Sequence, residues 1–170
     1  MNPNKKRLRR TMMFLNAQKP GLIKDPYIYK PDSIMLDLED AVAENQKDAA
    51  RFSLYHALKT INYRGCERVV RINGLDTPYW KEDIRCAVAG GCDAIRIPKT
   101  ESAQDVKVVE AEVVQAEKDF GREEGSVLIM SVNLPKDFSE LPFPAEITPK
   151  TFRHTLPEPE SSSWEQDRTW

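Results

Sequence analysis

The sequence predicts an α/β fold that corresponds to about the first half of a (β/α)8 barrel, followed by a proline-rich irregular tail. Short apolar runs alternate with segments of helical periodicity from residue 11 to residue 126. Strict alternation implies a parallel sheet, which is either doubly wound or part of a barrel. Polar residues follow the apolar runs at their carboxyl ends, where barrel enzymes build their sites, and this favours the half barrel.

The expected strands are short runs rich in apolar residues. They span residues 12–15, 34–38, 68–72, 94–97 and 127–132. The run at 94–97 stops at Pro98, which cannot continue a regular ladder. Each run except the last is followed by a segment with helical features, as a parallel sheet requires.

Helices are expected at residues 45–59, 79–89 and 102–120, with a shorter helical segment near residues 22–23. The segment 45–59 carries a broad apolar stripe, namely Ala49, Phe52, Leu54, Tyr55 and Leu58. Glycines at 90 and 91 end the second helix. Ser102 is placed to cap the last helix, whose inward positions are Val106, Val109, Val113 and Ala116, with Gly121 just beyond its end.

Composition narrows the class of protein. The 170 residues are 40% hydrophobic and 31% charged, which suits one globular domain. With 27 acidic and 25 basic residues, the net charge of −2 gives no field that would attract nucleic acid. No apolar run approaches the roughly 20 residues of a membrane span, and no export signal follows the basic start, so we expect a cytoplasmic protein. Cys66, Cys86 and Cys92 show no CxxC spacing, and we expect reduced thiols.

The chain divides by composition into three parts. Residues 1–10 form a basic tail, in which we expect the cluster of lysines and arginines to be solvated. Residues 11–133 form the partial barrel. Residues 134–170 hold six of the twelve prolines and no glycine, so they are expected to be poorly ordered.

Three carboxylates, Asp37, Glu39 and Asp40, lie at the polar end of the second apolar run. Carboxylates crowded at a strand end repel one another unless a cation lies between them. Arg71 supplies this cation from the end of the next run. An arginine braced by Glu39 and Asp40 can grip a carboxylate of a ligand with its planar fork of donors. The alternative is an ion pair that only joins neighbouring strands, and the spacing does not decide between these readings.

Two further polar residues follow predicted strands. Asn73 comes directly after the third strand, and Lys99 follows the fourth. Lys99 would be a Schiff-base candidate if desolvated, although a surface lysine is the commoner case. His56 falls on a helix, and His154 lies in the proline-rich tail without an ordered partner, so neither is a candidate base.

Several motifs in order resemble the HpcH/HpaI aldolase and citrate lyase superfamily, and within it the citrate lyase β subunits. They are RRTMMF (9–14), IMLDLEDAV (34–42), KDAAR (47–51), VVRIN (69–73), IRIPKT (95–100) and FGRE (120–123). The resemblance covers residues 9–126.

This resemblance implies a (β/α)8 barrel that cleaves a citryl thioester on an acyl carrier protein into oxaloacetate and an acetyl thioester. It assigns substrate binding to Arg71, which Glu39 and Asp40 brace, so that these three form the catalytic set; Asn73 and Lys99 join as substrate-binding residues. It also implies Mg²⁺ as cofactor, acyl carrier protein and transferase subunits as partners, and an oligomer.

The sequence departs from the family pattern beyond residue 126. Asn133 falls where the family has a magnesium-binding glutamate, so no complete metal site is expected, and no later segment resembles strands six to eight. We therefore expect impaired activity and a truncated or frame-disrupted end after about Ser126. Two alternatives stay open: a non-catalytic assembly or binding module of a lyase complex, and a CoA-thioester lyase completed by a partner chain.

Overall fold

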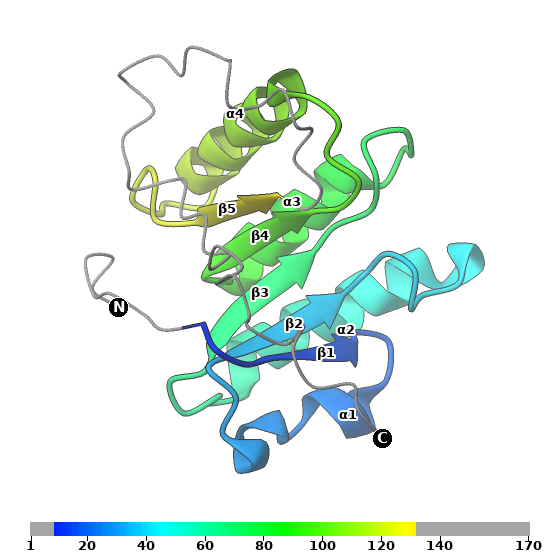
Figure 1. Cartoon of the computed structure of the whole chain (residues 1–170), viewed down its shortest axis with the longest axis vertical. Helices are drawn as coiled ribbons and strands as arrows, with labels where there is room; N and C mark the ends of the chain where they lie inside the picture. The colour runs from blue at the N-terminus through cyan, green and yellow to red at the C-terminus, as the bar shows by residue number, and fades with distance from the viewer. Residues whose placement is uncertain (1–8, 132–170) are drawn as a thin grey trace, which may run out of the picture.

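The computed structural model describes residues 9–131, which form a five-stranded parallel sheet (Figure 1). The strands are β1 (Met12–Asn16), β2 (Ser33–Asp37), β3 (Glu67–Arg71), β4 (Ala94–Ile97) and β5 (Leu128–Ser131). Their spatial order is β1-β2-β3-β4-β5, so each strand pairs with the next one in the sequence. The five strands predicted from the sequence are confirmed to within one residue at each end.

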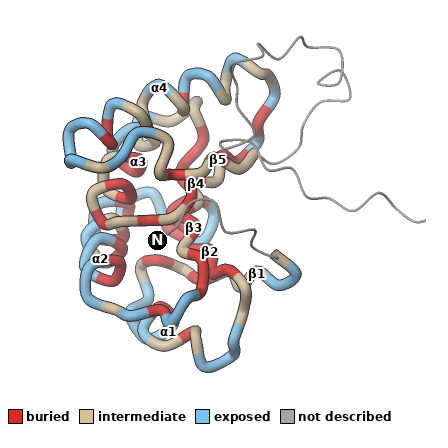
Figure 2. The backbone as a smooth tube through the Cα atoms, turned by 90° about the vertical axis from the view of Figure 1, so that its left-hand side faces the viewer, coloured by how far each residue is buried: buried red, intermediate tan, exposed pale blue. Residues whose placement is uncertain are grey.

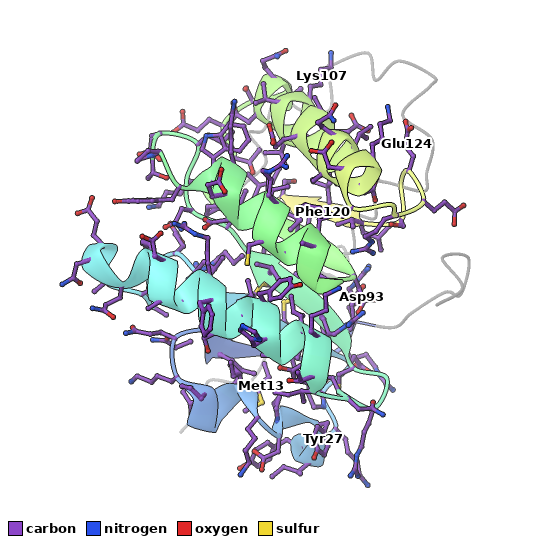
Figure 3. All side chains as sticks on the ribbon, turned by 180° about the vertical axis from the view of Figure 1, so that it is seen from behind. Met13, Tyr27, Asp93, Lys107, Phe120 and Glu124 are labelled. Atoms are coloured by element: carbon purple, nitrogen blue, oxygen red, sulfur yellow. The ribbon has the colours of Figure 1, made fainter. Side chains whose placement is uncertain are left out.

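The helices lie on one face of this sheet (Figure 3). They are α1 (Pro20–Ile23), α2 (Lys47–Thr60), α3 (Trp80–Gly90) and α4 (Ala103–Asp119), with two 3₁₀ turns, η1 (Pro26–Tyr29) and η2 (Glu44–Gln46). A doubly wound sheet would carry helices on both faces and would reverse its strand order at a switch point. The sequential order and the single helical layer are instead the arrangement of barrel strands.

Alternate residues of each strand point to opposite faces and form two unequal apolar clusters. The larger cluster includes Leu36, Val70 and Ile95. Figure 2 shows buried stretches, in red, along the central strands and in the helices beside them. The smaller one lies on the face opposite the helices, here called the inner face, and consists of Met35, Val69 and Ala94 with partly buried neighbours. Because Asp37, Arg71 and Arg96 are two residues further along the same strands, they lie on this inner face at its carboxyl end.

The predicted apolar stripe of the first long helix is partly wrong. The buried side chains of α2 are Lys47, Ala50, Leu54, Ala57 and Leu58. Ala49, Phe52 and Tyr55 are instead exposed. The segment also begins with the 3₁₀ turn η2, and its α-helical part begins only at Lys47.

Helix ends follow the sequence signals closely. Ser102 caps α4 in a capping box, in which its hydroxyl accepts from the Asp105 amide and the Asp105 carboxylate accepts from the Ser102 amide. Gly91 ends α3 with φ 95°, a left-handed conformation that glycine adopts without a Cβ clash. These two signals are therefore confirmed.

The expectation of a solvated basic cluster is wrong for Arg9. Its Nε and Nη2 donate to the two carboxylate oxygens of Glu67 at 2.6 Å each. Glu67 is buried at the start of β3 and also accepts from the Ser33 hydroxyl at 2.8 Å. Arg9 thus closes the amino-terminal end of the inner face.

The proposed tails, residues 1–8 of the basic segment and the segment 134–170, lie outside the described residues, as do Asn133 and His154. Within residues 9–131, no helix is both long enough and apolar enough to cross a membrane.

Candidate substrate site at the carboxyl end of the sheet

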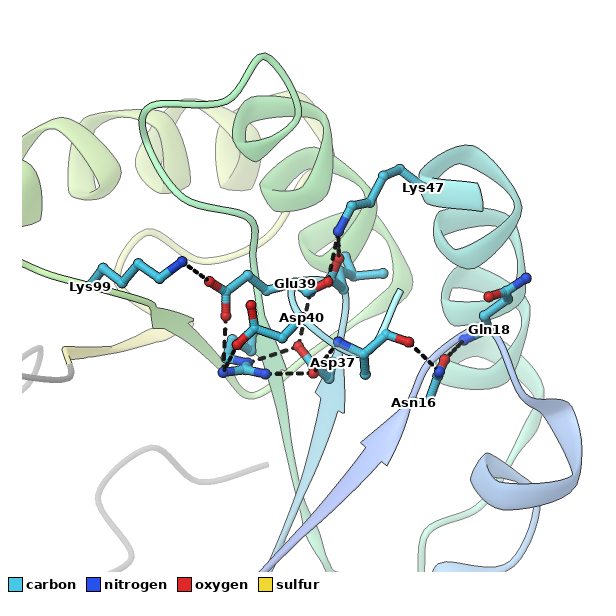
Figure 4. Close-up of polar contacts among 10 residues, drawn as sticks. Asn16, Gln18, Asp37, Glu39, Asp40, Lys47 and Lys99 are labelled. Carbon is cyan, nitrogen blue, oxygen red and sulfur yellow. Dashed lines mark hydrogen bonds and ion pairs between the residues drawn. The ribbon is translucent and has the colours of Figure 1, made fainter. Parts of the chain in front are cut away.

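Asp37 lies at the centre of the site (Figure 4), where it pairs with Arg71. The Nε of Arg71 donates to Oδ1 of Asp37 at 2.8 Å, and Nη2 donates to Oδ2 at 2.6 Å. The two residues are register partners on β2 and β3, so parallel pairing itself places the fork opposite the carboxylate. The hydrogen bonds to Asp37 raise the pKa of Arg71, and this effect outweighs burial, which acts to lower it.

The other acids of the loop after β2 take the remaining side of the guanidinium. Nη1 of Arg71 lies 2.9 Å from Oε2 of Glu39 and 3.5 Å from Oδ2 of Asp40. Glu39 is buried, whereas the Asp40 side chain is 69% exposed. Asp40 is therefore the longest and most accessible of the three contacts, and it is the one that an incoming ligand can displace at least cost.

Lys99 completes the ring of charges from the end of β4. Its Nζ lies 3.0 Å from Oε1 of Glu39, while the side chain is 71% exposed. The hydrogen bond to Glu39 and the nearby carboxylates raise the pKa of Lys99. A Schiff-base lysine needs the opposite shift, so this environment favours a positively charged side chain that attracts anions.

The loop that carries these acids is fixed by two groups. The carboxylate of Asp37 accepts the backbone amide of Glu39 at 2.9 Å and that of Ala41 at 3.3 Å. The ammonium of Lys47, the first residue of α2, donates to the carbonyls of Leu38 and Glu39 at 2.7 Å each. Burial of Lys47 lowers its pKa, and surrounding acids oppose that shift. The position of Glu39 is thus set before any ligand arrives.

A second arginine, Arg96, lies beside Arg71 and was not predicted. It is the register partner of Arg71 on β4. Both guanidiniums lie over the ring of Phe14 on β1, at 5.7 Å from the centroid for Arg71 and 5.8 Å for Arg96. Burial, with a contribution from the charge of Arg71, lowers the pKa of Arg96.

Asn73 does not join this cluster through its amide nitrogen. Its Nδ2 and its backbone amide donate to Oδ2 of Asp83 on α3, at 2.6 and 2.9 Å. Asp83 in turn accepts from Nη1 of Arg51 at 2.9 Å. These contacts tie the segment after β3 to α3 and α2, and its role as a substrate-binding residue stays a prediction.

The structure therefore brings Arg71, Glu39, Asp40 and Lys99 together, as the sequence predicted. The main partner of Arg71 is nevertheless Asp37, whereas the sequence analysis assigned the bracing of Arg71 to Glu39 and Asp40. The missed signal was strand register, because Asp37 and Arg71 are the last residues of neighbouring parallel strands. Arg96 lies inside an apolar strand and was not singled out. Strand register would have identified it too, because Arg96 is paired with Arg71 and its side chain lies on the same face.

Mg²⁺ does not fit the residues described. No group of three or more His, Cys, Asp or Glu side chains within residues 9–131 is arranged to hold a metal ion. Asp37, Glu39 and Asp40 each face a positively charged side chain instead. A hard dication would have to compete with Arg71 and Lys99 for these oxygens.

The parallel strands place an arginine, three acids and a lysine at one carboxyl edge, which is where proteins of the (β/α)8 barrel class build their sites. The chain belongs to the HpcH/HpaI aldolase/citrate lyase family, whose model matches residues 10–132.

Among curated proteins, the chain is similar to the citrate lyase subunit beta of Leuconostoc mesenteroides subsp. cremoris, with 50% identity over 128 residues that cover 75% of this chain and 42% of that protein. The subunit of Escherichia coli K12 is 41% identical over 79% of this chain and 45% of that protein. An L-malyl-CoA/beta-methylmalyl-CoA lyase of Cereibacter sphaeroides is 37% identical over 71% of this chain and 39% of that protein. The chain thus spans less than half the length of these relatives.

Solved structures show the same fold. A citrate lyase from Burkholderia xenovorans matches with a TM-score of 0.64 and 17% identity, covering 73% of this chain and 40% of that one. A malate synthase from Haloferax volcanii in complex with magnesium and glyoxylate matches with a TM-score of 0.60 and 17% identity, covering 75% and 43%. The sheet is therefore the first part of a (β/α)8-type barrel, as predicted.

Proposed function

We propose that the chain acts as a citrate lyase β subunit does, in cleavage of a citryl thioester on acyl carrier protein to oxaloacetate and an acetyl thioester. The observation that supports this is the Arg71 cluster, in which acids from the loop after β2 orient a guanidinium at the carboxyl edge of the sheet. Family membership and the 50% identity to a citrate lyase subunit beta support the same reaction class.

The proposed reaction breaks the bond between the carbinol carbon and the methylene carbon next to the thioester. The hydroxyl proton is lost, its oxygen becomes the keto oxygen of oxaloacetate, and the released methylene takes a proton to become the acetyl group. Arg71 would bind the carboxylate beside the carbinol carbon through N–H groups not aligned on Asp37, since a guanidinium has five. Glu39 would hold the fork in place, and Asp40 would move aside.

The citryl thioester as substrate, and acyl carrier protein and transferase subunits as partners, belong to this proposal and rest on the similarity to the citrate lyase subunits. No step above uses a metal, since the described residues do not form a site for one. An oligomer and a cytoplasmic location belong to the same proposal.

A non-catalytic binding module is the second candidate. It is favoured by the acids that already surround Arg71, since Nε and Nη2 donate to Asp37 and Nη1 lies 2.9 Å from Oε2 of Glu39. In that case the guanidinium links β2 to β3 and has no ligand to bind.

Binding of oxaloacetate to the purified full chain, followed by calorimetry, separates the two candidates. We expect measurable heat with the unaltered chain and its loss in Arg71→Ala. Release of oxaloacetate from a citryl thioester, with and without Mg²⁺, then tests the catalytic part.

Arg85→Ala is the matched control, because Arg85 pairs with Asp119 on the helical side at 2.8 Å. It should bind oxaloacetate as the unaltered chain does. If oxaloacetate gives no binding heat with the unaltered folded chain, the proposed oxo-acid site is overturned, and the non-catalytic binding module is the candidate that stands.

A further inference from the structure

Arg96 differs from its neighbour Arg71 in the groups that surround its guanidinium. Its Nη1 lies 3.5 Å from the sulfur of Met12, and its guanidinium lies over the Phe14 ring. No ion pair joins Arg96 to a carboxylate of residues 9–131, whereas Arg71 contacts three acids. The half-buried guanidinium of Arg96 therefore has donors without an anionic acceptor in that part of the chain.

An uncompensated, partly desolvated cation is unfavourable, and a bound anion relieves this cost. The acids that might otherwise neutralise Arg96 are already engaged, because Asp37 and Asp40 pair with Arg71 and Glu39 pairs with both Arg71 and Lys99. The charge of Arg71 adds to the field at Arg96. A negatively charged group at this point would meet two guanidiniums on neighbouring strands.

The relative placement of the two arginines limits what that group is. They are register partners on adjacent parallel strands, where backbones lie about 4.8 Å apart. Both flank the ring of Phe14, at 5.7 and 5.8 Å from its centroid. Two cations at this spacing suit a small acid that carries two carboxylates rather than one.

We propose that Arg96 binds the second free carboxylate of the substrate and thereby selects dicarboxylate oxo-acids over monocarboxylate ones. This inference rests on the proposed function. A citryl unit has two free carboxylates, and both remain in oxaloacetate. A malyl unit has one, which remains in glyoxylate. Arg71 takes the carboxylate beside the reacting carbon, and Arg96 takes the one on the methylene arm.

The test compares oxaloacetate with pyruvate, which has the same oxo-acid group but lacks the second carboxylate. Dissociation constants are measured by calorimetry on the full chain and on Arg96→Gln. We expect the substitution to raise the dissociation constant of oxaloacetate by about tenfold to a hundredfold, because a charge-assisted hydrogen bond is lost. The dissociation constant of pyruvate should not change. Arg96→Lys, which keeps the charge, should recover part of the oxaloacetate affinity.

The outcomes separate this inference from the proposed function. If the unaltered chain binds oxaloacetate no more tightly than pyruvate, or if Arg96→Gln weakens both acids equally, the role of Arg96 is overturned while the oxo-acid site stands. If the unaltered chain binds neither acid, the proposed function falls and this inference falls with it. Retained pyruvate binding by Arg96→Gln also shows that the variant is folded.

Discussion

Asp37 has two tasks at once, because its oxygens accept both the Arg71 fork and two backbone amides of the following loop. The hydrogen bonds to Arg71 measure 2.8 and 2.6 Å, and those from Glu39 and Ala41 measure 2.9 and 3.3 Å. A carboxylate that is buried and charged needs this many partners. The same residue therefore fixes the strand end, the loop and the orientation of the arginine.

We predict that Asp37→Asn destabilises the chain by about 2–3 kcal/mol, because it leaves the largely buried Arg71 without its bidentate partner. An amide cannot accept two N–H groups of the fork and the loop amides together. The free energy of unfolding in urea, with its slope, measures the effect.

Asp119→Asn is the control for this substitution. Asp119 also pairs with an arginine, Arg85, but at the partly exposed surface between α3 and α4. Solvent and salt screen such pairs, so its effect should be clearly smaller. Equal effects of the two substitutions would contradict a special role for Asp37.

The cysteines allow a second prediction at this scale. Burial raises the pKa of Cys92 to about 12 and that of Cys86 to about 11. At pH 8 both thiols are protonated, and the thiolate is the reactive form. We expect a thiol reagent at this pH to react with neither Cys86 nor Cys92 until urea unfolds the chain, as followed by absorbance. Rapid labelling of Cys92 in the folded chain would contradict this.

Single residues were predicted unevenly from the sequence, for physical reasons. Arg71 was found because the carboxylates crowded at the neighbouring strand end need a cation between them. Asp37 was grouped with Glu39 and Asp40 but was not singled out as the main partner, because that choice depends on strand register, which appears only once β2 and β3 are paired. Arg9 looked like a surface cation, since its contact with Glu67 joins residues far apart in the chain.

At the scale of elements, α2 and α3 are in close contact. A Cβ added to Gly90, the last residue of α3, would lie 2.8 Å from Cδ1 and 3.1 Å from Cβ of Leu58 on α2. Both helices pack on the same face of the sheet (Figure 3). Gly90 is therefore required by the approach of a neighbouring helix, in contrast to Gly91, which is required by its backbone angle.

We predict that Gly90→Ala destabilises the chain by about 1–2 kcal/mol. The methyl group forces Leu58 or the helices to shift, which costs about 1–3 kcal/mol, and the better helix propensity of alanine offsets part of this. Thermal unfolding followed by circular dichroism measures the change.

Gly21→Ala serves as the comparison. Gly21 lies in α1, and a Cβ there meets no atom within 4 Å. This substitution should be neutral or slightly stabilising. A stabilised Gly90→Ala would mean that α2 and α3 pack less closely than described.

Element prediction succeeded where a local signal decides and failed where packing decides. The cap of α4 depends only on Ser102 and Asp105, which lie within one turn, and it was predicted correctly. The buried face of α2 depends on how the helix is rotated against the sheet. Phe52 and Tyr55 fit an apolar stripe in the sequence, yet Ala50 and Ala57 face the core, because small residues allow the helix to approach the strands.

For the whole molecule, the sheet has a covered face and an inner face of different character. The covered face holds the large apolar cluster under the helices. The inner face has arginine and glutamate at its amino-terminal end, a small apolar cluster in its middle and the Arg71 cluster at its carboxyl end. Within residues 9–131, β1 and β5 each pair with only one strand, and such edges are available for further pairing.

The barrel class was predictable because alternation and strand-end polarity are properties of the whole sequence. Strand order follows from the same pattern, since consecutive strands joined by helices become neighbours in a barrel.

We predict that the purified chain associates through the β1 side of this inner face. Phe14 lies there on an edge strand and is 54% exposed, and Phe52 on the outer side of α2 is 69% exposed. If the inner face and its edge drive association, Phe14→Gln lowers the mass measured by light scattering after size exclusion, and Phe52→Gln leaves it unchanged. The two substitutions remove the same side chain from two surfaces, so the comparison isolates the location. A lower mass only with Phe52→Gln would assign association to α2, and a monomeric unaltered chain at high concentration would refute association altogether.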